Sequence, residues 1–253
     1  MEINGIALTF LEIPAELTQE YNRWYDLDHM PEHVSKADVL MGRRYVHPRS
    51  LRSLPGLLSS EEFGDQAPYA TIYFHGGPLD FTTPEARELW QAMDQIILRA
   101  GRYWKDGKAK SGGRFWLGES FTKPGIYVST PAVPYINHRG VIFAYGRPSS
   151  PDKREAAQAW WRDTHLPDLF AVPGVFAALR FDPVAGDPNE DTMLYMIMCD
   201  EPVADVMIAI EESKRYTRAI GRFPAHKGVY EPIAFLPYDR IVPFEYDFDF
   251  GTD

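Results

Sequence analysis

Two histidines are the side chains of this sequence best suited to chemistry. Each follows an aromatic pair and precedes an apolar residue, a proline and an acid, in residues 24–32 (WYDLDHMPE) and 160–168 (WWRDTHLPD). Imidazole titrates near neutral pH, so it can act as a general acid or base with little adjustment of its pKa. We therefore expect His29 or His165 to transfer protons in a reaction.

The surroundings of His29 are the more polar. Asp28 and Glu32 can orient its ring, and His33 can carry a second proton. The second half has Leu169 at the position of His33. These differences predict a polar catalytic site in the first half, and an apolar substrate pocket or none in the second. The alternative is that the repeated histidines only cap a helix.

Residues 29–33 also spell H-x-x-E-H, a pattern found in zinc proteases. Such a site needs an unbroken helix, whereas Pro31 lacks an amide hydrogen and is expected to end or kink the helix. His29 would then lie at a helix C-terminus, where the backbone carbonyls favour the protonated ring. We expect no metal and no cofactor, although a looser metal site built from histidines of the first half is left open.

The two motifs recur at a constant offset, since residue 160 lies 136 positions after residue 24. Self-similarity over half the chain indicates a duplicated unit. We predict an α+β fold in which two tandem ferredoxin-like βαββαβ units form one intramolecular dimeric α/β barrel. The expected boundaries are residues 1–123 and 137–236, followed by an extended acidic and aromatic tail over 237–253.

Local patterns give each unit the order strand, helix, strand, strand, helix, strand. In the first unit the strands are expected at 6–13, 43–47, 69–75 and 114–121, with helices from 15 and 83. In the second unit they are expected at 141–145, 179–182, 193–199 and 229–235, with helices from 150 and 202. The segment 48–68 is much longer than its counterpart, and whether it is a lid is left open.

These residues resemble the EthD-like group of the dimeric α/β-barrel superfamily. The second half carries the closer match, with WWxxxHLPD at 160–168, PGV at 173–175 and Arg180-Phe181. The resemblance implies a pocket between sheet and helices that takes a small aromatic or lactone substrate. It also implies polar groups in that pocket that transfer protons without a cofactor. Other members of the superfamily, the chlorite dismutases, bind heme.

Six further residues are candidates for contacting such a substrate: Tyr25, Arg44, Tyr73, Trp161, Arg180 and Tyr195. An arginine can hold a carboxylate or lactone oxygen by a forked hydrogen bond. Aromatic rings can line a pocket, and a phenol can donate a proton. For each residue, core packing or pairing within the repeated framework is the simpler alternative.

Composition narrows the class of protein. The 253 residues carry a formal net charge of −10, which argues against a nucleic-acid-binding protein. Cys199 is the only cysteine, so no internal disulfide can form. We expect no signal peptide, no membrane-spanning stretch of ~18 apolar residues and no nucleotide-binding glycine motif. A cytoplasmic protein is expected.

The expected function is that of a cofactor-independent lyase or isomerase in catabolism, acting on a small, hydrophobic, oxygenated aromatic compound. The expected partner is that substrate, without nucleic acid or membrane, and a homodimer of the tandem barrel is left open. Two alternatives are kept. One is a heme-dependent enzyme of the chlorite dismutase kind, and the other is a non-catalytic binding protein for an aromatic ligand.

Overall fold

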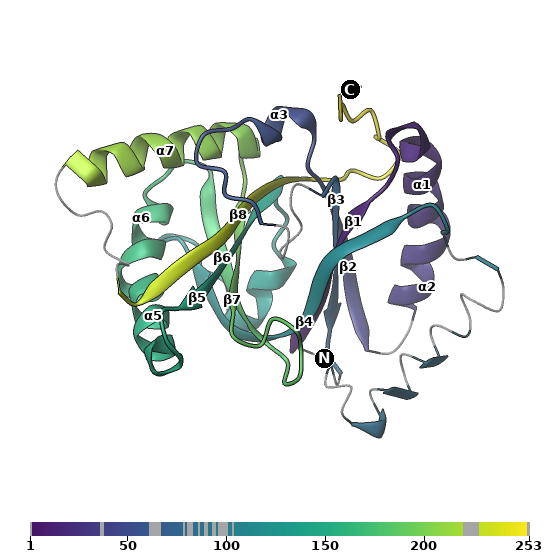
Figure 1. The fold of residues 1–253 in the computed structure, drawn as a ribbon, viewed down its shortest axis with the longest axis horizontal. Helices are drawn as coiled ribbons and strands as arrows, with labels where there is room; N and C mark the ends of the chain where they lie inside the picture. The colour runs from purple at the N-terminus through teal and green to yellow at the C-terminus, as the bar shows by residue number, and fades with distance from the viewer. Residues whose placement is uncertain are drawn as a thin grey trace.

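Eight antiparallel strands form one closed barrel in the part of the chain that the computed structural model describes (Figure 1). The described residues are 2–35, 38–60, 67–77, 79, 83–85, 87–88, 91–92, 95, 101–102, 104–219 and 228–251. The strands are β1 (Gly5–Glu12), β2 (Val39–Val46), β3 (Tyr69–His75), β4 (Lys108–Thr122), β5 (Gly140–Pro148), β6 (Val175–Pro183), β7 (Met193–Cys199) and β8 (Tyr230–Arg240).

Each half of the chain contributes four neighbouring strands to the barrel. Their order is β4-β1-β3-β2 in the first half and β8-β5-β7-β6 in the second, which is the ferredoxin-like arrangement twice. The halves join extensively along β4 and β6, from Phe115↔Pro183 to Thr122↔Ala177. They join briefly at β2 and β8, where Tyr45 pairs with Arg240 and Val46 with Asp239. The predicted tandem barrel is therefore confirmed.

Helices cover the outside of the barrel on two opposite sides (Figure 1). The helical segments of the first half are η1 (Ala15–Leu17), α1 (Thr18–Trp24), η2 (Tyr25–His29), α2 (Met30–Val34) and α3 (Arg49–Arg52). Those that follow are η4 (Thr130–Tyr135), η5 (Pro151–Lys153), α5 (Arg154–Trp160), η6 (Trp161–His165), α6 (Leu166–Phe170) and α7 (Val203–Ala219). No described helix is long and apolar enough to cross a membrane.

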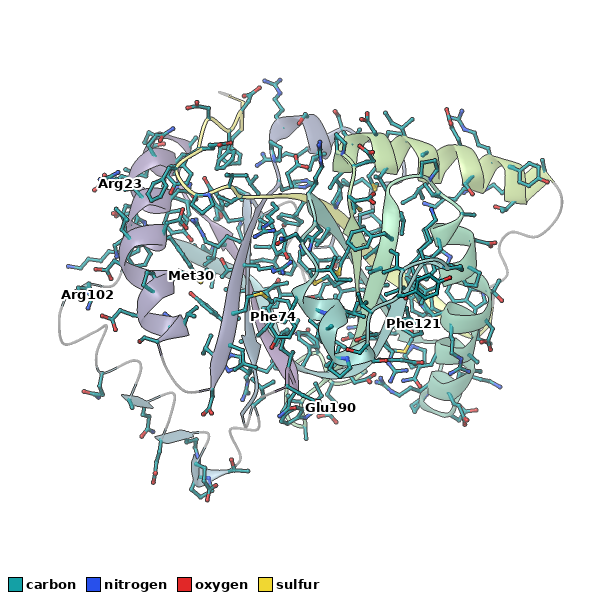
Figure 2. All side chains as sticks on the ribbon, turned by 180° about the vertical axis from the view of Figure 1, so that it is seen from behind. Arg23, Met30, Phe74, Arg102, Phe121 and Glu190 are labelled. Carbon is teal, nitrogen blue, oxygen red and sulfur yellow. The ribbon has the colours of Figure 1, made fainter. Side chains whose placement is uncertain are left out.

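The alternation of side chains along the strands produces three apolar cores. Inward-facing residues fill the barrel, where Phe10 meets Phe143 edge-on at 5.7 Å between ring centroids and Phe74 points inside (Figure 2). Outward-facing residues pack under the helices and form a separate core in each half. Because side chains fill the barrel interior, a substrate site is not expected inside the barrel.

The prediction that the first helix ends at His29 is wrong. The segment η2 is a turn of π-helix, and the Met30 amide donates to the Tyr25 carbonyl five residues back. The wider turn accommodates Pro31, which has no amide hydrogen to donate, so the helix continues through α2 to Val34. The same π-helical turn recurs in the second half, where η6 lies directly before α6 and its Pro167.

Three other predicted segments differ from the structure or lie outside it. Strand β8 continues to Arg240, so it includes the beginning of the segment expected as a tail. Most of the helix expected from residue 83, and residues 61–66 of the long loop, lie outside the described residues. The described part of that loop contains α3 and reaches the second half, where Leu58 pairs with Phe235.

Candidate active site

The second half contains a partly open apolar cavity between its sheet and its helices. The volume of the cavity is about 150 Å³. Its lining residues are Gly56, Leu58, Ala144, Tyr145, Trp160, Trp161, His165, Lys214, Tyr230, Pro232, Ala234 and Phe235. The wall is mostly aromatic and aliphatic, and only a few side chains bring polar groups to it. Such a composition is typical of a small-molecule site.

Aromatic rings fix the orientation of His165 at the cavity wall. The imidazole stacks on Trp160 with 4.7 Å between ring centroids, and it meets Trp161 edge-on at 4.5 Å. Trp161 in turn stacks on Tyr195, at 3.8 Å and 8° between planes. His165 also borders a smaller space of about 40 Å³ next to the cavity. Two of the predicted residues, His165 and Trp161, therefore line one site.

Lys214 on α7 is a second polar group at this wall, and the sequence analysis missed it. Its ammonium donates to Glu211 Oε1 at 2.7 Å and lies 5.2 Å from the centre of the Phe235 ring. Lys214 borders both the cavity and the smaller adjoining space, as His165 does. No local pattern marks this lysine, because exposed helix faces commonly carry Glu–Lys pairs.

A segment of the first half forms the roof of this cavity. Leu58 and Phe235 exchange two backbone hydrogen bonds, of 3.4 and 2.6 Å. Gly56 has a φ of +81°, and a Cβ at this position would lie 2.3 Å from Glu211 Oε1. The segment thus touches α7 closely at a glycine and β8 at Leu58, which closes the cavity from above the sheet.

The corresponding site of the first half is packed with its own side chains. His29 stacks on Trp24 at 4.6 Å, meets Tyr25 edge-on at 4.7 Å and lies 4.2 Å from His33. His33 stacks on Tyr73 at 4.7 Å. The Nδ1 atom of His29 is buried and has no hydrogen-bond partner among the described residues.

Burial makes His29 a poor acid or base at neutral pH. Burial, followed by the charges of His33, Arg44 and Arg102, lowers the pKa of His29 to about 3. The expectation that helix carbonyls favour the protonated ring is therefore wrong, because the helix does not end there and the ring is desolvated. His29 is neutral at pH 7 and a weak base.

The acidic residues near His29 are engaged by arginines. Arg102, which lies on the outer side of the helix (Figure 2), bonds Asp28 at 2.7 Å and Glu32 at 2.9 Å. Both carboxylates that were expected to orient His29 thus serve this ion-pair cluster. No local sequence pattern links Arg102 to these acids, since it lies 70 residues or more from both.

Arg44 acts as a framework residue under the same helix. Its guanidinium pairs with Asp26 at 3.0 Å and lies 4.1 Å above the Tyr25 ring. Asp26 also accepts a short hydrogen bond from the hydroxyl of Tyr246, which belongs to the C-terminal segment. The Tyr25 and Tyr73 hydroxyls share a hydrogen bond of 2.8 Å. Tyr25, Arg44 and Tyr73 are thereby held together as a closed network.

Arg180 and Tyr195 lie behind the wall of the second site rather than on it. Arg180 pairs with Glu119 at 3.3 Å and with Asp182 at 3.2 Å. Burial raises the pKa of Tyr195, whose hydroxyl has no hydrogen-bond partner among the described residues. This phenol stays protonated at neutral pH and supports Trp161 by stacking.

The described residues contain no group of three or more His, Cys, Asp or Glu side chains that could hold a metal ion. Pro31 does not prevent an H-x-x-E-H site, since the helix continues through it, but His29 and His33 stack among aromatic rings. Cys199 is buried, and burial raises the pKa of its thiol. A thiolate nucleophile is therefore not available there at neutral pH.

The cavity does not fit a porphyrin. A volume of about 150 Å³ suits one benzene-sized ring, since an engineered apolar cavity of about that volume binds benzene. A porphyrin is several times larger.

Comparison with known proteins identifies the fold. No family model matches the sequence, and no curated protein does. An anthrone oxidase-like protein aligns over 96% of this chain and 92% of its own, with 12% identity and a TM-score of 0.56. A dye-decolorizing protein from V. cholerae aligns over 94% of each chain, with 12% identity and a TM-score of 0.55.

A third structure, of a protein provisionally named as a chlorite dismutase (TA0507), aligns over 95% of this chain and 96% of its own. The identity is 10% and the TM-score 0.53. Likeness at this identity concerns the fold and leaves the chemistry open. The narrower resemblance to the EthD-like group stays a prediction, whereas the fold is that of a dimeric α/β barrel whose two ferredoxin-like units lie in one chain.

Proposed function

We propose that this protein is an enzyme that acts without a cofactor, as a lyase or isomerase, on a small aromatic compound bound in the second-half cavity. The observation that carries the proposal is a partly open, mostly apolar space of about 150 Å³ with an oriented imidazole on its wall. The space accepts a single ring, and the imidazole can exchange a proton with it.

His165 is assigned the acid–base role in this proposal, and His29 is not. His165 borders two open spaces, whereas His29 is packed among aromatic rings and has a pKa of about 3. Trp160 and Trp161 hold the His165 ring on two sides, so its ordering is complete before a substrate binds. Preorganised proton transfer of this kind contributes about 10²–10⁴-fold to a rate.

The aromatic wall supplies the binding energy. Trp160, Trp161, Tyr230 and Phe235 present rings around the cavity, and offset or edge-on contacts with a bound ring are worth about 0.5–1.5 kcal/mol each beyond its burial. Among the described residues, Lys214 and the titratable His165 are the side chains of the lining that can carry a charge. These features favour an apolar ring with a polar substituent.

The test pairs binding with turnover. The protein is incubated with a panel of single-ring oxygenated aromatics, binding is followed by thermal shift, and products are detected by mass spectrometry. We expect the wild type to bind and convert a member of the panel, His165→Ala to bind without conversion, and His29→Gln to retain conversion.

Two outcomes would overturn parts of the proposal. Conversion that survives in folded His165→Ala would remove the histidine from the mechanism. Binding without conversion of any compound in the panel would instead favour a non-catalytic binding protein for an aromatic ligand.

A further inference from the structure

Two polar side chains of the cavity also line the smaller space beside it. His165 and Lys214 each border both spaces. They come from separate helical segments, η6 and α7. A bound ring that turns a substituent toward the smaller space would meet both groups.

The Lys214 ammonium has N–H donors that make no hydrogen bond with the described residues. An ammonium group carries three N–H donors, and the described residues give it one hydrogen bond, to Glu211. The side chain is 24% exposed and that of Glu211 is 15% exposed, so the pair is largely withdrawn from water. The ammonium also lies near the face of Phe235, a cavity wall.

The neighbouring carboxylate limits what the ammonium can accept. A substrate with a permanent negative charge would approach Lys214 beside the Glu211 carboxylate, and like charges at short range repel. A neutral hydroxyl avoids this repulsion and can both donate to an imidazole nitrogen and accept from an ammonium. The wall therefore favours a hydroxyl over a carboxylate substituent.

We propose that the cavity selects a single aromatic ring with a phenolic hydroxyl, an inference that rests on the proposed function of this cavity. The hydroxyl donates a hydrogen bond to a ring nitrogen of His165 and accepts one from the Lys214 ammonium. Glu211 is a positioning residue that holds the lysine.

The proposal predicts a ranking of ligands. Phenol and toluene have nearly the same shape, so they differ in the hydroxyl alone. A hydrogen bond to a charged group is worth enough for phenol to bind about 10- to 100-fold more tightly than toluene.

The experiment measures dissociation constants of phenol, toluene and benzoate by calorimetry at pH 8, for the wild type, Lys214→Met and the control Lys153→Met. Lys153 lies on the exposed segment η5, so its variant removes the same charge far from the cavity wall. We expect Lys214→Met to abolish the preference for phenol while toluene binds as before, and Lys153→Met to retain it.

The remaining outcomes separate the inference from the function on which it rests. Equal affinities for phenol and toluene, or tighter binding of benzoate than of phenol, would overturn the substrate class and leave the aromatic cavity intact. Failure of all three compounds to bind would instead overturn the proposed function.

Discussion

Four largely buried histidines should make this protein lose stability steeply in mild acid. Burial is the main cause that lowers the pKa of His29 and His138 to about 3, and of His47 and His75 to about 4. In the unfolded chain each titrates near 6.5. The folded protein therefore stays unprotonated at these sites at pH 5.5, where the unfolded chain binds nearly one proton per site.

The sign and size of the effect follow from this difference in bound protons. Stability is complete above the unfolded pKa of 6.5 and is lost as pH falls toward the folded values of 3 to 4. Between pH 7 and pH 5.5 each histidine lowers the free energy of unfolding by about 1.3 kcal/mol, which amounts to about 5 kcal/mol for the four. Domains are typically stable by about 5–15 kcal/mol, so the loss is a large share of the total.

Urea unfolding followed by circular dichroism at pH 7.0, 6.25 and 5.5 measures this slope. His138→Gln should reduce the slope by about a quarter, since one of four sites is removed. The neutral His138 ring bonds Arg43 at 2.7 Å and Tyr45 at 2.9 Å, and an amide can replace these contacts well enough to keep the fold. Lys153→Met should leave the slope unchanged. A free energy of unfolding that is constant from pH 7.0 to 5.5 would refute the reasoning.

Three substitutions test the contacts around the two sites. Tyr25→Phe removes the partner of the buried Tyr73 hydroxyl and should cost about 1–3 kcal/mol in urea unfolding, whereas replacing both tyrosines should recover most of it. Asp26→Asn removes the carboxylate that pairs with Arg44, whose side chain is 4% exposed, and should lower the free energy of unfolding by about 3–5 kcal/mol. A loss below about 1 kcal/mol would contradict a buried ion pair. Gly56→Ala places a methyl group against the Glu211 carboxylate on α7, which should displace the roof segment. Toluene should then dissociate faster, as measured by NMR exchange. An unchanged dissociation rate would argue that residues 56–58 do not cover the cavity.

The architecture could be predicted because the two halves carry the same residue types at equivalent positions. An aromatic pair, a histidine and a proline recur at one offset, and each unit alternates strand and helix patterns that a barrel must combine. The continuation of the helix past Pro31 could not be predicted from proline chemistry alone. It depends on a π-helical turn whose bonds avoid the missing amide hydrogen, and that turn is stabilised by tertiary packing of Met30 in the space left by Gly42.

The site was only half predictable for a related reason. His165 and Trp161 belong to the repeated motif, so the sequence marks them. Lys214 and the roof at residues 56–58 belong to no motif. They are more than 150 residues apart in the sequence, and only the fold brings them to the same cavity. Sequence patterns report neighbours on one element, whereas a cavity wall is assembled from several.

The polarity of the first-half motif carries no information on the volume around its histidine. Tyr21 occupies the repeat position of Ala157, and its ring packs against Trp24, Tyr25, Tyr69 and Trp104 at 5.3–6.0 Å. Trp24 and Tyr25 in turn contact His29, so the first-half motif is packed with its own rings. The second half has only a methyl group at the position of Tyr21, and its histidine borders the cavity. The volume of the side chains around each histidine, more than their charge, therefore distinguishes the two halves.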